Sequence, residues 1–569
     1  MAFKKHASPE LHEITDDSQP ELAMIEDRIQ SSSPGDHSRE HQSSEKRLFQ
    51  KNGAVNLIPM PTTNPKDPLN LSDGRKIAAI LALCLFGSMA AAAELILGAM
   101  LPVFSFEYAD LDPKYLVDIH LPAGSNGLAI LAAFPGPPIW EIYLLASLPV
   151  LMIGIANFFL VPMSIAMGRR NILLITGVIA IAGCIGSGFS TSLGSHLACR
   201  TIQALGAGTV ESLIPFIIQD IVFYHQRNAA ISVVFATQGL VIVTLGVASP
   251  YIIGMASWRY IYYVTAAAGG LFWIFVFFVL PETKFERSED ELNGIPAVPL
   301  RPGQSRPELD YARYPRRTLK GDLALFTGKP DWKAGRTALW DSLRTFFYPH
   351  LFFITMLNSA VIAVALAAGY TAAPQLLAEP WSWPFYHLGF CLFPIIVAAG
   401  ASFVVSGWGA DIVANWLAKK SGKRNPEFQV LNLILPCAVG LAGCLLFGFS
   451  GDNPEKYHWM MFLMGLGMIA FSFLATNTIG IVYVLESHPH LTGPSLVNIA
   501  SFRCLIAFVL SFRVSEWVAE LGYLKTFCMY AGILGAFILF IPIIYIWGDK
   551  WRQRWLGLPK ERASQNQHM

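Results

Sequence analysis

The sequence predicts an all-α membrane protein with twelve transmembrane helices in two six-helix halves. Of its 569 residues, 53% are hydrophobic and 14% are charged, a balance that a water-soluble surface of this size does not tolerate. Apolar runs of about 20 residues, the length that crosses a hydrocarbon core at about 1.5 Å per residue, recur after residue 76. Lipid is therefore the expected solvent for most of the chain.

Charges, Gly and Pro residues and polar clusters bound twelve such runs. In the first half we expect spans near 77–103, 139–162, 171–190, 196–219, 229–254 and 259–280. In the second half we expect them near 348–372, 385–408, 428–449, 459–485, 496–518 and 524–547. The resulting division is a disordered cytosolic tail (1–76), an N-terminal half (77–280), a cytosolic linker (281–347), a C-terminal half (348–547) and a cytosolic C-terminal tail (548–569).

Two segments need a separate interpretation. The linker is charged and rich in Pro, but residues 338–347 have the apolar spacing of a short helix lying on the membrane surface; a solvated helix fits this pattern nearly as well. Residues 119–138 contain an apolar stretch that is too short to span alone. We expect an extracellular or re-entrant segment there, because a separate span would invert every later loop.

Charge in the loops predicts the orientation, because loops rich in Lys and Arg resist translocation. Basic residues gather on one side, at Arg75-Lys76, Arg169-Arg170, Arg227, the linker, Lys419-Lys420 and Lys550 to Arg554. The opposite loops are acidic. Both termini are therefore expected in the cytosol, and we expect the plasma membrane as the location.

Other protein classes find little support. The net charge of +1 gives no basic excess for nucleic acid. The eight cysteines all lie in apolar runs without paired spacing, and His488 and His490 form a single His cluster where a membrane di-iron enzyme needs several. Nucleotide-binding, Walker and nucleophile-elbow motifs are missing. We expect no enzyme, no metal and no cofactor.

Several short motifs resemble those of the major facilitator superfamily, in its fungal drug:proton antiporter-like branch. Asp67-Pro68-Leu69-Asn70 precedes the first span, Gly168-Arg169-Arg170 follows the second, and Arg200 to Gly208 resembles the fourth-helix "R-x-x-Q-G-x-G-x-G". The resemblance continues at Asp220 with Arg227, Gly246 to Gly254, Trp258-Arg259, Pro281-Glu282-Thr283, Gly409 to Asp411, Asn425 to Phe428, Tyr483 to Ser487 and Arg503 to Phe527. It implies the major facilitator fold, a monomer, and transport of a small molecule coupled to protons.

The sequence departs from the family's pattern at two places. Ile165 and Ala166 stand where the first loop has an Asp-Arg pair, so the charge relay of that loop is in doubt. Ser249 and Ile253 replace two glycines of the fifth-helix antiporter signature. These departures weaken the inference of antiport without affecting the fold. The residues expected in the gating loops are Arg169, Arg170, Asp220, Arg227, Asp411 and Glu486.

Ionisable side chains inside spans are costly and usually face the bundle interior, so they indicate a substrate or ion path. Glu94, Arg200, Glu211, Arg513 and Glu516 lie inside expected spans. Arg200, Gln203 and Glu211 share one face of the fourth helix, with about 16 Å between Arg200 and Glu211 along its axis. Arg513 and Glu516 are three residues apart, for which a local pair is the default explanation.

We expect Glu94 to carry the proton, with its charge balanced by Arg200; a packing ion pair is the alternative. Polar residues of the second half that are expected to contact substrate are Asn358, Tyr370, Ser472, Thr476 and Tyr483, with Arg513 added to this set. Contacts between helices explain them nearly as well.

The sequence thus predicts a secondary active transporter, with proton-coupled efflux of a small hydrophobic or amphipathic molecule as the first choice. Proton-coupled uptake of a small cationic nutrient and a non-transporting sensor with the same fold are the alternatives.

Overall fold

The structure is a computed structural model. It describes residues 57–113, 116, 126–133, 135–292, 294–301, 304–325, 329–421, 425–488 and 491–554; for residues 90–99, 289, 319 and 320 it describes the backbone alone. The chain divides into two units, Met1–Arg47 and Leu48–Met569, and every described residue belongs to the second.

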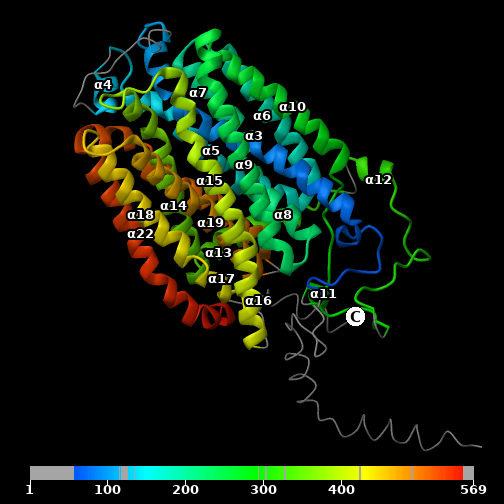
Figure 1. Ribbon diagram of the computed structural model, residues 1–569. Helices are drawn as coiled ribbons and strands as arrows, with labels where there is room; N and C mark the ends of the chain where they lie inside the picture. The colour runs from blue at the N-terminus through cyan, green and yellow to red at the C-terminus, as the bar shows by residue number, and fades with distance from the viewer. Residues whose placement is uncertain are drawn as a thin grey trace, which may run out of the picture. The chain divides into compact units, whose positions relative to one another are not determined.

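Twelve helical segments match the expected spans (Figure 1). Eleven of those in the described part of the chain are long and apolar enough to cross a membrane. We take α3, Asp73–Glu107, as the remaining span, because its 35 residues extend about 52 Å at 1.5 Å per residue. The other five of the first half are α5 (Ile139–Met167), α6 (Arg169–Phe189), α7 with α8 (Leu193–Ala207 and Val210–Ile221), α9 (Arg227–Met255) and α10 (Arg259–Val279).

The second half repeats this arrangement of six spans. It contains α14 (Pro349–Leu377), the segment Phe385–Ser421, the segment Glu427–Asp452, α19 (Trp459–Ser487), the segment Thr492–Ser511 and α22 (Val514–Arg554). The first of these segments comprises η4 (Phe385–Leu392), α15 (Phe393–Ser402), η5 (Phe403–Gly409) and α16 (Ala410–Ser421). The other two comprise α17 (Glu427–Leu431) with α18 (Ile434–Asp452), and α20 (Thr492–Val497) with η7 (Asn498–Phe502) and α21 (Arg503–Ser511).

Local sequence sets where several helices begin and end. Ser192 and Ser195 form a reciprocal capping box at the start of α7, which satisfies backbone donors that a helix start leaves unpaired. Pro349 occupies the first turn of α14, where its missing N–H costs nothing. Gly522 interrupts α22 with φ 85° and ψ 171°, a conformation that is essentially restricted to glycine. The turn between the eleventh and twelfth spans therefore lies at Gly522.

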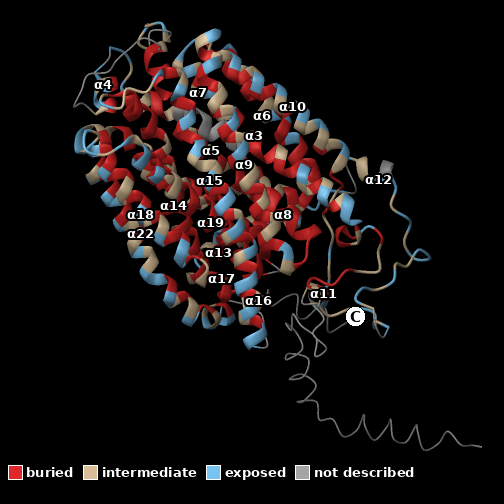
Figure 2. Ribbon diagram, viewed as in Figure 1, coloured by how far each residue is buried: buried red, intermediate tan, exposed pale blue. Residues whose placement is uncertain are grey.

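The helices pack closely where small residues face one another. A Cβ added to Gly183 of α6 would lie 2.3 Å from the backbone N of Gln203 in α7, and one added to Gly206 would lie 2.3 Å from the N of Ala180. Such contacts are typical of helix association in membranes. The buried residues, red in Figure 2, concentrate on helix faces turned inward, while large apolar side chains such as Phe189, Leu271 and Leu539 are exposed. An apolar outer surface of this kind suits lipid.

The segment 119–138 does not form a span of its own in the described residues. Residues 126–133 form a single short helix, α4 (Gly127–Ala132), whose six residues extend about 9 Å. It packs against the second half: Asn126 donates to the carbonyl of Val518 at 2.5 Å, and Gly127 lies against the backbone of Pro374. Residues 117–125 and 134 lie outside the described residues.

The tail and linker contact each other. Residues 1–56 of the expected tail lie outside the described residues, but residues 57–72 pack on the linker, so the disorder expected for 1–76 does not extend to them. η1 (Pro68–Asn70) follows the buried Asp67, and the backbone of Met60 and Thr63 bonds to Glu291 and Asp310. The linker itself contains α11 (Glu289–Leu292), α12 (Leu319–Leu323) and α13 (Trp332–Phe346).

Candidate functional site

A buried ion pair joins the two halves of the protein. Glu211, in the first turn of α8, pairs through Oε2 with Nη2 of Arg503, the first residue of α21. The Arg503 side chain is 2% exposed and that of Glu211 is 15% exposed. Burying the carboxylate and the guanidinium as a pair costs less free energy than burying either charge without its partner. Separating the two side chains inside the protein is therefore unfavourable.

Both charged residues follow an interruption of their helix. The fourth span breaks at Gly208 and Thr209, directly before α8, and the eleventh contains the π-helical turn η7 directly before Arg503. Gly208 lies so close to α5 that an added Cβ would be 2.6 Å from the Cβ of Ala156. Short π-helical turns inside α-helices occur frequently at functional sites.

Three uncharged polar residues complete this central cluster, which we define as Asn157, Glu211, Ser212, Asn477 and Arg503. Arg503 Nη1 donates to Oδ1 of Asn477, and Ser212 Oγ donates to Oδ1 of Asn157. Asn157, Ser212 and Asn477 are at most 1% exposed. Four helices, α5, α8, α19 and α21, supply the cluster, so both halves contribute.

The central cluster can exchange partners. Asn477 Nδ2 and Arg503 Nε have no hydrogen-bond partner among the described residues. The guanidinium can hold an anionic or carbonyl group of a ligand, and the carboxylate can take a proton or a cationic group in place of Arg503. The cluster therefore offers one acidic and one basic position side by side.

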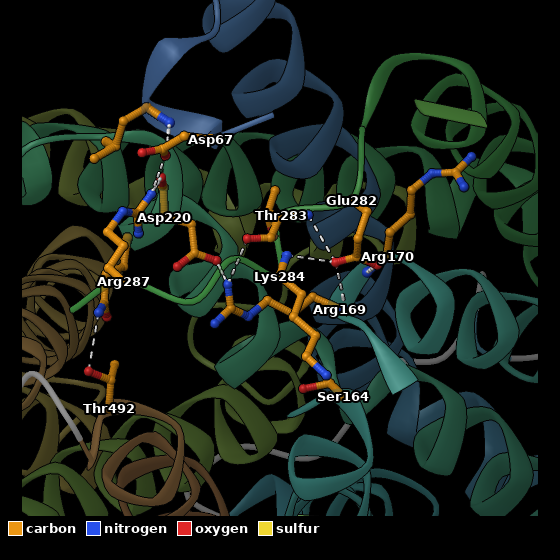
Figure 3. A network of polar contacts seen from close by, with 12 residues as sticks. Asp67, Ser164, Arg169, Arg170, Asp220, Glu282, Thr283, Lys284, Arg287 and Thr492 are labelled. Carbon is orange, nitrogen blue, oxygen red and sulfur yellow. Dashed lines mark hydrogen bonds and ion pairs between the residues drawn. The ribbon is translucent and has the colours of Figure 1, made fainter. Parts of the chain in front are cut away.

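A second polar network lies at the end of the bundle that includes Arg169 and Arg227, which we call the basic end (Figure 3). Arg169 pairs with Asp220, donates through Nη1 to the carbonyl of Thr283 at 3.1 Å, and lies with its guanidinium 3.9 Å from the ring centre of Phe216. The backbone N–H groups of Arg169 and Arg170 donate to the carboxylate of Glu282. The loop after the second span is thus held to the fourth span and to the start of the linker.

Asp67 extends this network to the tail. Its carboxylate caps η1 by accepting from the N–H of Leu69 at 2.9 Å, and it pairs with Arg287 of the linker at 2.6 Å. Arg287 also reaches the carbonyl of Asp220 at 3.5 Å, and Figure 3 shows it between the two aspartates. The contact between the DPLN segment and the linker therefore passes through buried charges.

Ile165 and Ala166, which stand at the positions of the family's Asp-Arg pair, make an apolar contact and a backbone hydrogen bond. Ile165 lies beside Gly493 of α20, where an added Cβ would be 2.7 Å from Ile165 Cδ1. The carbonyl of Ala166 accepts from Lys284 Nζ at 3.2 Å. An apolar contact with the second half stands at Ile165, while Arg169, Asp220 and Glu282 carry the charge interactions.

Polar contacts bridge the two halves at both ends. At the basic end, Gln219 donates to Thr492 Oγ1 at 3.1 Å, and Asn228 donates to Asp411 Oδ1 at 2.7 Å. At the opposite end, the hydroxyl of Tyr370 donates to the carbonyl of Ala146 at 3.1 Å. Hydrogen bonds therefore join the two halves on both sides of the central cluster.

Other expected residues of the first half lie as follows. Arg200 is buried and donates to Gln203 Oε1 at 2.7 Å and to the carbonyl of Leu145 at 3.2 Å. The side chain of Glu94 lies outside the described residues, so its pairing with Arg200 stays a prediction. Arg170 donates to the carbonyls of Phe277, Leu323 and Ala324, and the buried Arg227 lies with its guanidinium 3.8 Å from the ring centre of Tyr224.

In the second half, Ser472 and Thr476 face α18 of the same half: Thr476 Oγ1 lies 3.8 Å from Cys437 Sγ, and Ser472 lies against Gly440. Asn358 donates to the carbonyl of Ile354 at 3.1 Å and lies beside Gly480. Tyr483 and Glu486 are buried near the basic end of α19.

Arg513 and Glu516 form the local pair, at 2.9 Å with an Arg513 side chain that is 47% exposed. They do not reach the central cluster.

The sequence analysis missed several residues of these two networks, Ser212 and Arg287 among them. Arg503 lies in the middle of the expected span 496–518, where its charge alone is a signal. Asn157 and Asn477 also lie inside expected spans, but an amide is a weaker signal than a charge. Glu282 belongs to the Pro-Glu-Thr motif, which indicated the end of the first half and not a contact with Arg169.

No cluster of three or more His, Cys, Asp or Glu side chains suited to a metal ion occurs in the described residues. His488 instead lies against His350, with 3.0 Å between their Nε2 atoms, and His490 lies outside the described residues.

Comparison with known proteins identifies the family. The family model described as Major Facilitator Superfamily matches residues 83–511. Protein HOL1 of Saccharomyces cerevisiae is 20% identical over 90% of this chain and 93% of its own, and the MFS antiporter QDR2 of Candida albicans is 22% identical over 67% of this chain and 75% of its own.

Solved structures agree on the fold. The proton:xylose symporter XylE of E. coli, at 13% identity, covers 84% of this chain and 97% of its own with a TM-score of 0.53. The chain therefore belongs to the major facilitator superfamily of membrane transporters.

Proposed function

We propose that this protein is a proton-coupled exporter of a small amphipathic organic molecule, and that Glu211 of the central cluster carries the proton. The observation that supports the proposal is the buried Glu211–Arg503 pair between the halves. The proposal also places the protein in the plasma membrane, as a monomer with both termini in the cytosol.

The coupling follows from the energetics of the pair. A transporter of this fold exposes its centre to one side at a time by moving its halves apart, and that motion separates Glu211 from Arg503 if nothing replaces their contact. Leaving a buried charge without its partner costs about 3 to 5 kcal/mol, which reduces the population of the opened state by 100-fold or more. Protonation of Glu211 removes one of the two charges and lowers that cost. Binding of a proton and opening of the halves are then linked.

Glu211 gives the substrate its polar contact. While it carries no proton, its carboxylate can accept from a hydroxyl, amine or other donor group of the substrate, and the guanidinium of Arg503 and the amide of Asn477 can hold a carbonyl or hydroxyl group beside it. The helices around them present mainly apolar side chains, which suit the rest of an amphipathic molecule. Substrate and proton therefore compete for the same pair, as exchange of one for the other requires.

Among the relatives, vrtL of Penicillium aethiopicum is named an efflux pump, which favours export over uptake. The alternative is uptake of a small cation. The structure offers an argument for it, because such a cation could replace Arg503 as the partner of Glu211. A sensor of the same fold would bind its ligand without moving it.

Accumulation of a panel of labelled compounds in cells with and without the protein, at two external pH values, tests the direction. Lower accumulation of a compound on expression supports export, higher accumulation means uptake, and binding without flux means a sensor. Proteoliposomes loaded with the responding compound then test the role of Glu211.

The variant Glu211→Gln keeps the shape of the side chain and cannot change charge. We expect it to lose transport driven by a pH gradient while retaining exchange of labelled for unlabelled compound. Glu516→Gln is the matched control, because Glu516 forms a local and partly exposed pair. Gradient-driven transport by Glu211→Gln at the rate of the control would refute the assignment of the proton to Glu211.

A further inference from the structure

Helix α13 of the linker bridges the two halves at the basic end. Its buried residues are Gly335, Ala338, Ser342 and Thr345. Against the first half, Gly335 lies on Ala166 of α5, where an added Cβ would be 3.1 Å from the Cβ of Ala166. Against the second half, the Asn498 amide of η7 contacts Thr345 Oγ1 at 2.8 Å, and the rings of Phe346 and Phe502 stack with centroids 4.0 Å apart.

The outer face of α13 carries large apolar side chains that nothing in the described residues covers. Trp332, Trp340, Leu343 and Phe347 are exposed, Trp340 to 69% and Phe347 to 73%. At about 100° per residue they fall within one sector of roughly 80°, on the side of the helix away from its buried residues. A water-facing helix would not be expected to display such a stripe.

Basic residues accompany this apolar stripe. Lys333, Arg336 and Arg344 are exposed, and Arg336 lies within the same sector as the two tryptophans. Asp341 points to a different side, about 100° beyond Trp340, and Asp331 uses its carboxylate to cap the helix by accepting from the N–H of Ala334. The outer face therefore combines aromatic and cationic groups.

The outer face of α13 adjoins the exposed apolar surface of the membrane spans. The helix ends three residues before Pro349, the start of α14, and the Phe346 ring lies 5.3 Å from that of Phe352. Phe352 lies on the membrane span α14 and is itself exposed. Tryptophan and long cationic side chains are the residues preferred at the boundary between hydrocarbon and headgroups.

We propose that the outer face of α13 binds phospholipids of the membrane leaflet at the basic end, with Lys333, Arg336 and Arg344 selecting anionic headgroups. The apolar stripe enters the acyl boundary, and the three cations remain at headgroup level. Each cation near an anionic surface contributes about 1 kcal/mol, which corresponds to roughly a fivefold preference. This proposal is independent of what the protein transports.

Photo-crosslinking in the full-length protein tests the proposal. Benzoylphenylalanine is introduced at Phe347, and at Tyr311 of the polar linker as a control site. The proteins are reconstituted in phosphatidylcholine vesicles with about 10% phosphatidylserine. We expect lipid adducts at position 347 and few at position 311. We also expect phosphatidylserine to be enriched at least threefold in the adducts over its share of the vesicle.

Charge variants then test the selection of headgroups. One triple variant combines Lys333→Gln, Arg336→Gln and Arg344→Gln. In its adducts, the share of phosphatidylserine should fall to the share that this lipid has in the vesicle. The control triple variant combines Arg301→Gln, Arg313→Gln and Arg316→Gln, which removes three exposed cations of the same linker. It should leave the enrichment of phosphatidylserine intact. Only variants that elute as a single species and keep the parental Tm in detergent are compared.

Three outcomes would overturn the proposal. Adducts at position 347 with the chain itself, such as residues 1–56, or with another protein would assign the surface to a different occupant. Lipid adducts without enrichment of phosphatidylserine would remove the role of the cations. Loss of enrichment in the control triple variant would mean that general charge, and not α13, selects the lipid.

Discussion

Glu211 and Arg503 form an ion pair that links the fourth span of one half to the eleventh span of the other. Both residues follow interruptions of their helices. We expect the pair to contribute to stability as well as to transport.

Removing one member of the pair should destabilise the protein more than removing both. Arg503→Met leaves the Glu211 carboxylate buried without its partner, for an expected loss of about 3 kcal/mol, whereas Arg503→Met with Glu211→Gln leaves no charge behind. The measurement is thermal unfolding of both variants and of Glu211→Gln in the same detergent, combined in a double-mutant cycle. Strict additivity of the three Tm shifts would mean that the two side chains do not interact in solution.

The network at the basic end should hold that end closed. Arg169→Gln removes the contacts to Asp220 and to the carbonyl of Thr283, so the first loop is released and the halves open more often at this end. A cysteine at Ile165, which lies between the halves beside Gly493, reports the opening through its labelling rate by a water-soluble maleimide. We expect labelling to rise severalfold, because loss of a buried charge pair is worth more than 1 kcal/mol.

The labelling experiment is carried out in protein that also carries Cys528→Ser, because Cys528 is exposed and would itself react with the maleimide. Asp220→Asn should raise the labelling rate as Arg169→Gln does, and the double variant should add little. Glu516→Gln, which removes the carboxylate of a local pair, serves as the control. An unchanged labelling rate in Arg169→Gln would show that the network is not a latch.

Gly522 should tolerate no side chain, because its backbone conformation belongs to glycine and an added Cβ would lie 2.5 Å from Asp452 Oδ1. Gly522→Ala is expected to lower stability by about 2 kcal/mol. Gly532→Ala, ten residues on in the same helix, has open space around the added Cβ and should be neutral or slightly stabilising. Thermal unfolding of the two variants in parallel measures this difference in stability. Equal Tm values would contradict the strain at Gly522.

Hydropathy and motif order were sufficient for the fold, because a lipid solvent imposes a length and a composition on each span. The second span begins at Ile139 as expected, yet it runs to Met167 through Pro162, since a membrane helix tolerates an internal proline that a sequence pattern treats as an end. The turn of the last two spans was placed between 518 and 524 and lies at Gly522.

The contacts within the site were much less accessible from the sequence. Helix periodicity placed Glu211 on an inner face, but the identity of its partner depends on which helix of the other half lies opposite, and this is a property of packing. Ser472 and Thr476 illustrate the same limit, because a polar stripe on α19 is equally consistent with facing the other half or facing α18. Arg503 differs, since its charge within a span was visible in the sequence.

Tyr370 should hold the opposite end closed, since its hydroxyl donates across the interface to the carbonyl of Ala146 at 3.1 Å. Tyr370→Phe removes that hydrogen bond, which is worth about 1 kcal/mol, and should raise the population open at this end about fivefold. Tyr523→Phe is the matched control, because the hydroxyl of Tyr523 donates to the carbonyl of Thr371 within the same half. Distances between spin labels on the two halves, measured by pulsed electron paramagnetic resonance, report the populations. A shift in Tyr370→Phe and none in Tyr523→Phe is expected; the same distance distribution in both variants would assign Tyr370 to packing alone.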